Sequence, residues 1–195
     1  MIRPTIQEVF INTKNIINKP YYLPKNKNKG NHGCFLENLT GIPNSSDCLD
    51  CLDGEVKTFP IKINKNGEIV PKESIAITMI SKDIENNISF LESKVYKKLS
   101  KIVFIPYTRE DEYVKYLEPV MIDLNSLENR ELFEILKNDY EEIQKYYLIN
   151  ETLNGSSKLG KYLQNRTKGP GKKVIKTRAF YLRPQFIKEV LFKLI

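Results

Sequence analysis

Asp50, Glu55 and Lys57 are the residues whose types and spacing most clearly suggest chemistry. Successive side chains of a β-strand point to opposite faces, so a strand that begins after Gly54 would project Glu55 and Lys57 from one face. Two carboxylates can bind Mg²⁺ through oxygen, and a lysine beside them can orient or deprotonate a water or stabilise charge on phosphorus. The pattern therefore fits metal-assisted phosphodiester cleavage, although an exposed Glu/Lys pair at a strand edge would read the same way.

The chain has 195 residues, of which 41% are hydrophobic and 28% charged, and this predicts one domain over residues 1–195 with a substantial core. No apolar run approaches the ~20 residues of a membrane span. The N-terminus has no apolar signal core. We therefore expect an intracellular, cytoplasmic protein without a membrane partner.

The net charge of +7 is unevenly distributed. Residues 155–183 contain no Asp or Glu, and their basic residues are Lys158, Lys161, Arg166, Lys168, Lys172, Lys173, Lys176, Arg178 and Arg183. Apolar and aromatic residues interrupt this block, which favours a folded basic face over a disordered tail. Nucleic acid is the partner that such a face predicts, and a solvated basic surface without a ligand is the alternative.

The cysteines and the single histidine offer little catalytic chemistry. Cys34, Cys48 and Cys51 are odd in number, so a disulfide scaffold is not expected. A zinc site built on Cys48 and Cys51 would need Cys34 and His32 to complete it, and buried apolar cysteines are the preferred interpretation. We expect His32 to be a loop residue and not a catalytic base.

Periodicity and turn signals predict a mixed succession of helices and strands. In order they are a helix that Thr5 and Glu8 cap, a loop over 21–29, a helix that ends at Gly41, a strand over 55–63, a hairpin turn at Asn66-Gly67, a return strand over 68–80, a helix over 90–99, a buried strand over 101–107, a strand pair over 113–124, an amphipathic helix over 127–149, basic loops, a strand over 178–182 and a helix that Pro184 opens. This order predicts an α/β (α+β) domain with a mixed sheet.

The chain from Lys29 onward resembles the MutH family, which contains the mismatch-repair nickase MutH and related type II restriction enzymes, several of which cut at GATC. The resemblance lies in five ordered stretches: Lys29-Gly-x-x-Gly-x-x-Leu-Glu37, Gly54-Glu55-Val56-Lys57-Thr58-x-Pro60, Lys98-Leu99-x-Lys101-Ile-Val-Phe-Ile-Pro106, Tyr162-Leu163-Gln-x-Arg166-Thr-Lys168 and Arg178-Ala-Phe180-Tyr181-Leu182-x-x-x-Phe186. It implies a MutH-like fold with the restriction-endonuclease-like PD-(D/E)xK core.

The resemblance also implies catalytic roles. Asp50 and Glu55 would bind Mg²⁺, Lys57 would be the catalytic lysine and Glu37 an accessory acid on its helix. Lys98, just before the buried strand, matches a lysine near the scissile phosphate.

DNA contacts are implied mainly within residues 155–183. The implied DNA-binding residues are Lys29, Arg166, Thr167, Lys168, Arg178 and Tyr181. Those at 166–168 match a loop that reads bases in the major groove, where Arg or Lys can pair with guanine O6 and N7.

One assignment stays open at this point, because Asp47 and Asp50 both suit the metal aspartate. Asp50 better preserves the distance back to Glu37 and is preferred, while Asp47 lies in the more typical polar lead-in. The nickase-type loop carries a proline at the position of Thr167. Threonine there, followed by Lys168, is more typical of the restriction-enzyme branch.

We therefore expect a sequence-specific, Mg²⁺-dependent endonuclease of double-stranded DNA, of the type II restriction class with a GATC-like site. A strand-specific repair nickase and a non-catalytic DNA-binding module are the alternatives. Because one chain carries one active site, cutting both strands would need a homodimer, a second subunit or two successive nicks.

Overall fold

The computed structural model describes residues 2–25, 30–80, 82–168 and 177–194. Its helices are α1 (Ile6–Ile16), α2 (Asn31–Thr40), α3 (Lys94–Leu99), α4 (Arg130–Asn150) and α5 (Pro184–Glu189). Its strands are β1 (Pro20–Tyr22), β2 (Glu55–Ile63), β3 (Ile69–Pro71), β4 (Ile75–Met79), β5 (Lys101–Glu110), β6 (Tyr113–Tyr116), β7 (Val120–Asp123), β8 (Leu163–Lys168) and β9 (Thr177–Leu182). Short 3₁₀ turns lie at Phe90–Glu92, Leu127–Asn129, Ser156–Lys158 and Leu191–Lys193.

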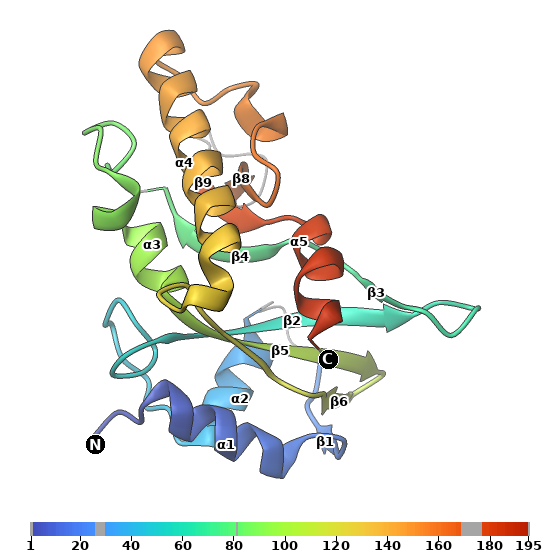
Figure 1. Cartoon of the computed structure of the whole chain (residues 1–195). Coiled ribbons are helices and arrows are strands. Elements are labelled where there is room, and N and C mark those ends of the chain that lie inside the picture. Colours follow the sequence, from blue (N-terminus) through green and yellow to red (C-terminus); the bar gives the residue numbers. More distant parts are fainter. Residues whose placement is uncertain (1, 26–29, 81, 169–176, 195) are drawn as a thin grey trace.

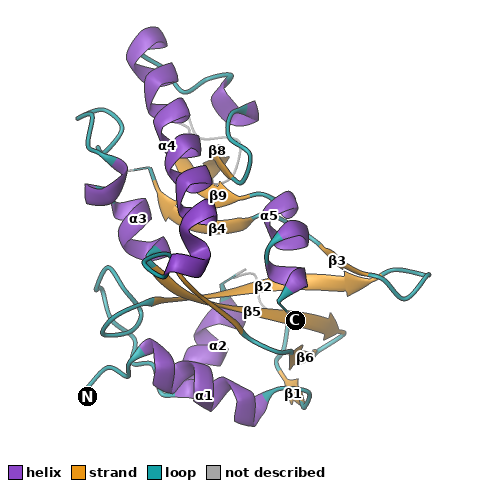
Figure 2. Cartoon of the chain, in the orientation of Figure 1, coloured by secondary structure: helices purple, strands orange, loops and turns teal. Residues whose placement is uncertain are grey.

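The strands form two sheets within the described residues (Figure 2). The main sheet has the order β1-β6-β5-β2-β3, and β7 pairs with one end of β5. Its central strands β2 and β5 run parallel, while the neighbouring pairs are antiparallel. The smaller antiparallel sheet has the order β4-β9-β8. The predicted α/β domain with a mixed sheet is confirmed.

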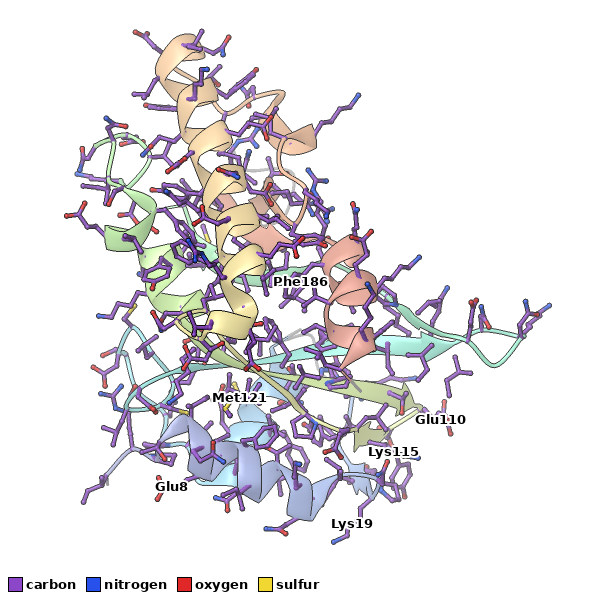
Figure 3. All side chains as sticks on the ribbon, viewed as in Figure 1. Glu8, Lys19, Glu110, Lys115, Met121 and Phe186 are labelled. Carbon is purple, nitrogen blue, oxygen red and sulfur yellow. The ribbon has the colours of Figure 1, made fainter. Side chains whose placement is uncertain are left out.

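Helices cover both faces of the main sheet (Figure 1). Helices α1 and α2 lie on one face, where Val56, Val103 and Ile105 join their apolar side chains in one core cluster. The other face contributes Phe59 and Phe104 to a larger cluster shared with α3, α4, α5 and the small sheet. Phe186 of α5 lies in this second layer (Figure 3), with its ring centroid 5.6 Å from that of Phe104. The two clusters hold β2 and β5 rigidly between them.

Several predicted ends of elements are confirmed. Thr5 caps α1 in a capping box, accepting from the Glu8 amide at 3.3 Å while the Glu8 carboxylate accepts from the Thr5 amide at 2.7 Å. Gly41 ends α2 with a φ of 82°, a conformation that glycine adopts without strain.

Three predicted elements were wrong. The return strand over 68–80 is divided into β3, which pairs with β2, and β4, which pairs with β9 of the other sheet. Pro71, without an N–H to donate, stands at the end of β3. The segment expected as basic loop contains β8, and the loop expected over 21–29 begins within β1.

The expected environments of His32 and of two cysteines were also wrong. His32 lies in the first turn of α2 and not in a loop; its ring stacks on Tyr107 at 4.5 Å between centroids. All three thiols are free, but only Cys51 is buried, since Cys34 is exposed and Cys48 is half-buried. No helix among the described residues is long and apolar enough to cross a membrane.

The backbone before β2 is packed so tightly that only glycine fits at position 54. A Cβ on Gly54 would lie 2.8 Å from the Lys101 carbonyl oxygen and 2.9 Å from the Ile6 Cβ. Gly54→Ala should therefore lower the free energy of unfolding by about 1–3 kcal/mol, measured by urea denaturation. Gly33→Ala is the control, because its Cβ would meet nothing nearer than 3.8 Å. Equal stability of the two variants would contradict this packing.

Thiol reactivity should separate the cysteines. Burial, with the Asp50, Asp53 and Glu55 carboxylates acting in the same direction, raises the pKa of the Cys51 thiol to about 12. Because only the thiolate is an effective nucleophile, alkylation of the native protein near pH 8 should label Cys34 well before Cys51. Peptide mapping by mass spectrometry would measure both rates. Similar rates before denaturant is added would contradict the buried position of Cys51.

Candidate active site

The strand β2 presents Glu55 and Lys57 from one face, as the alternation of the sequence predicted. The two residues lie opposite Ile102 and Phe104 in the parallel register with β5. On its other edge β2 pairs with β3 only through residues 61–63. Among the described strands, the first part of β2 therefore has β5 as its pairing partner on one side and an open edge on the other.

Glu55 is a fully buried carboxylate held by two lysines. Its side chain is 0% exposed, and its Oε1 atom is ion-paired with Lys57 and with Lys98, whose Nζ is 2.6 Å away. Its Oε2 atom is also buried and has no hydrogen-bond partner in the described structure. A buried carboxylate oxygen without a partner is costly, so this atom is suited to binding a cation.

Asp50 is the aspartate that lies beside these groups. Its Oδ2 accepts a hydrogen bond from the Val56 amide at 3.0 Å and lies 3.8 Å from Lys57 Nζ. The strand itself therefore orients the Asp50 carboxylate toward the lysine.

The two other aspartates of this turn have different partners. Asp47 forms an ion pair with Arg3 at 3.3 Å and is 55% exposed. Asp53 accepts from the Ile6 amide and from Lys101 Nζ, both at 2.8 Å. This geometry favours Asp50 over Asp47 for the role left open by the sequence.

Glu37 lies on α2, half-buried, and belongs to the same electrostatic group. Burial is the main cause that raises its pKa above the usual range for glutamate, and Asp50 and Glu55 act in the same direction, while Lys57 partly opposes them. The structure thus brings together Glu37, Asp50, Glu55 and Lys57, which the sequence placed up to twenty positions apart.

Lys57 is stabilised in its charged form by these acids. Burial by itself would lower its pKa, but the Glu55, Asp50 and Glu37 carboxylates outweigh burial and raise it. Lys57 is therefore protonated in this arrangement at neutral pH. Any change that neutralises the carboxylates would also lower the pKa of Lys57.

The donor set fits Mg²⁺ better than a metal that needs many protein ligands. Among the described residues, no group of three or more His, Cys, Asp or Glu side chains is gathered closely enough to hold a metal ion. Mg²⁺ is commonly bound through one or two carboxylates and completes its shell with water and substrate phosphate. Asp50 and the unpaired oxygen of Glu55 satisfy that requirement.

The residues expected to read DNA bases lie on the small sheet. Arg166, Thr167 and Lys168 are exposed on β8. The Arg166 guanidinium lies over the Tyr181 ring of β9, 5.6 Å from its centroid, and donates to Ser74 Oγ at 3.3 Å. Arg166 is thus held in place by Tyr181 and Ser74 but is still exposed to solvent.

The two other residues expected to bind DNA, Arg178 and Lys29, are not part of β8. Arg178 lies on β9 opposite Thr167 and donates to Asn165 Oδ1 at 2.6 Å and to Asn154 Oδ1 at 2.9 Å. Its guanidinium is thus engaged within the protein, and its role in DNA binding stays a prediction. Lys29 lies outside the described residues.

Ser74 is a contact of this site that sequence reasoning missed. Besides Arg166, the buried Gln164 of β8 donates to its hydroxyl at 3.1 Å. About ninety positions separate Ser74 from both partners. Serine between two short strands is so common that no local signal could have identified it.

Comparison with known proteins supports the resemblance. Residues 43–139 match the family model described as "DNA mismatch repair enzyme MutH". The DNA mismatch repair protein MutH of Buchnera aphidicola subsp. Baizongia pistaciae is 30% identical over 183 residues, which is 82% of this chain and 79% of that protein. The protein of the same name from Vibrio parahaemolyticus serotype O3:K6 is 28% identical over 189 residues, 88% of this chain and 82% of its own.

Among solved structures, the complex of restriction endonuclease MvaI with its cognate DNA aligns over 94% of both chains, with a TM-score of 0.45 and 14% sequence identity. The match to the Buchnera protein extends across most of both chains, and the family model covers the segment that carries Asp50, Glu55, Lys57 and Lys98. The chain belongs to the MutH family of endonucleases.

Proposed function

We propose that this protein is a sequence-specific endonuclease of double-stranded DNA that depends on a divalent metal, with Mg²⁺ as the ion. One observation carries the proposal. Glu55 is buried beside Asp50, its Oε1 is held by Lys57 and Lys98, and its Oε2 has no partner among the described residues. A surface Glu/Lys pair would be solvated, and a simple DNA-binding module gains nothing from buried acids near phosphate.

Asp50 and Glu55 are proposed to hold the metal, which when bound supplies positive charge to the transferring phosphoryl group and activates a water. Lys98 shares Glu55 Oε1 with Lys57, which leaves Oε2 as the Glu55 oxygen that would bind the metal. Glu37 is proposed as an accessory acid beside these groups, where burial and the Asp50 and Glu55 carboxylates raise its pKa and so favour its protonated form.

Lys57 is proposed to act on the attacking water. Two of the carboxylates that raise its pKa, Glu55 and Asp50, are also the proposed metal ligands, so metal binding to them would weaken this effect and lower the pKa of Lys57. Lys57 can then orient the water or accept its proton. Cleavage of the phosphodiester by water would leave a 5′-phosphate.

Base recognition is proposed for the β8–β9 sheet. Arg166 is supported by Tyr181 and Ser74, which limits the side-chain freedom that it would lose on binding. A guanidinium so placed can pair with guanine O6 and N7, while Thr167 and Lys168 add contacts to bases or phosphates. Tyr181 would lie beside the bases that Arg166 reads.

For the mode of cleavage we propose double-strand cutting at a GATC-like site, as in type II restriction enzymes, because Thr167 and Lys168 resemble that branch. A strand-nicking repair endonuclease is the second candidate, because the relatives are named DNA mismatch repair protein MutH. Supercoiled plasmid with Mg²⁺ separates the two. Linear fragments that share an end sequence support the restriction mode, and open circles without linear product support nicking.

Lys57→Ala should reduce plasmid cleavage on the order of a thousandfold, because it removes the group proposed to act on the water. DNA binding in Ca²⁺ should stay within a few-fold of wild type. Lys137→Ala is the matched control, since Lys137 is a half-buried lysine on α4 whose ion pair with Glu141 spans 3.9 Å. Full cleavage by Lys57→Ala would remove this residue from the mechanism.

Arg166→Ala should weaken binding to the cleaved sequence by about 1–3 kcal/mol and relax discrimination at one base pair. Affinity for unrelated DNA should change much less, as measured by fluorescence anisotropy with both duplexes in Ca²⁺. Arg130→Ala, at an exposed position where α4 begins, is the control. An equal loss on all sequences would make Arg166 a phosphate contact and not a base contact.

A further inference from the structure

The turn that carries Asp50, residues 47–54, lies outside any helix or strand. Within it the Cys51 amide donates to the Gly54 carbonyl at 3.0 Å. Such a turn depends on contacts from elsewhere to keep one shape. Those contacts come from the N-terminal segment Arg3–Ile6, which runs beside the turn in Figure 1.

Arg3 binds the turn just before Asp50. Its Nη1 donates to the Leu49 carbonyl at 3.0 Å and lies 3.3 Å from the Asp47 carboxylate. The Arg3 side chain is 27% exposed, whereas that of Asp47 is 55% exposed. Because exposed ion pairs contribute little, the bond to Leu49 should be the more important of the two.

The next residues bind the turn just after Asp50. The Leu52 amide donates to the Pro4 carbonyl at 3.0 Å. The Ile6 amide, at the first turn of α1, donates to Asp53 Oδ1 at 2.8 Å. Asp53 is held from the other side by Lys101 Nζ at 2.8 Å, so this end of the turn is tied to both α1 and β5.

These contacts enclose Asp50 on both sides, at Leu49 and at Leu52. A shift of the backbone here would move the Asp50 carboxylate relative to Lys57, 3.8 Å away, and to the Val56 amide that it accepts from at 3.0 Å. Metal affinity depends on how firmly ligating carboxylates are oriented by groups that do not touch the metal.

We propose that the segment Arg3–Ile6 is a positioning element of the metal site, and that Arg3 acts by fixing the backbone on the N-terminal side of Asp50. The inference rests on the proposed function, because it takes Asp50 as a metal ligand. The inference also goes beyond the proposed function, because Arg3–Ile6 lies before the two parts of the chain on which the family likeness was argued. These are residues 43–139, which match the family model, and the resemblance that begins at Lys29. The inference assigns a role to Asp47 as well, that of an auxiliary partner of Arg3 and not a metal ligand.

The test measures metal dependence separately from turnover. Ca²⁺ is titrated into full-length protein with a duplex that the wild type cleaves, and binding is followed by anisotropy; Mg²⁺ is titrated in plasmid cleavage. Arg3→Ala should raise the half-saturating concentration of both ions on the order of tenfold, with a smaller change in the rate at saturating Mg²⁺. Arg3→Lys should recover part of the shift, because it keeps a charged donor.

Two further variants make the result specific. Asp47→Asn leaves the bond from Arg3 to Leu49 and should shift the half-saturating concentration less than twofold. If Asp47 were a metal ligand, Asp47→Asn would instead have as large an effect as Asp50→Asn. Lys14→Ala removes an exposed lysine of α1 that forms an ion pair with Glu118 at 3.4 Å. This control should leave the half-saturating concentrations of both ions unchanged.

A second readout does not involve metal. Local opening of the turn in Arg3→Ala should accelerate alkylation of the buried Cys51 at least several-fold, while exposed Cys34 serves as internal reference. If DNA binding and cleavage by the wild type do not depend on divalent ions, both the proposed function and this inference would be overturned. If the wild type depends on divalent ions but Arg3→Ala has the same half-saturating ion concentrations, this inference alone would be overturned.

Discussion

The buried carboxylate of Glu55 is the constraint on which the rest of the site depends. Two lysines, Lys57 and Lys98, neutralise one of its oxygens, and the other is left without a partner among the described residues. Such a group is stable only if its surroundings are rigid and its remaining oxygen can meet a cation. The parallel β2–β5 pair, packed between two apolar clusters, holds the group in place.

The link between β3 and β4 connects this strand to the sheet that carries the proposed base-reading residues. The Lys72 amide donates to the Pro60 carbonyl of β2 at 3.1 Å, and two residues later Ser74 accepts from Gln164 and Arg166 of β8. A short segment therefore contacts both the proposed catalytic strand and the proposed recognition strand. In a family of endonucleases, such a connection offers a direct route by which base contacts and the cleavage site can be kept in register.

The sequence predicted what local rules determine and missed what distant contacts decide. Alternation alone placed Glu55 and Lys57 on one face, and capping rules located the start of α1 and the end of α2. Spacing did not decide between Asp47 and Asp50, because their environments depend on Arg3 and on the Val56 amide. Strand β8 was missed because its exposed basic end resembles a loop, while its pairing with β9 crosses the intervening chain. The split between β3 and β4 likewise follows from the choice of sheet, which no local signal encodes.

The most direct measurement is the position of Mn²⁺, by anomalous diffraction, in crystals of the protein with DNA. The ion replaces Mg²⁺ with similar ligands and scatters strongly enough to be located. We expect a peak within bonding distance of Glu55 Oε2 and of Asp50, with a DNA phosphate completing the shell. A peak bound by Asp47, or a Glu55 Oε2 that stays without a metal at saturating Mn²⁺, would contradict this expectation.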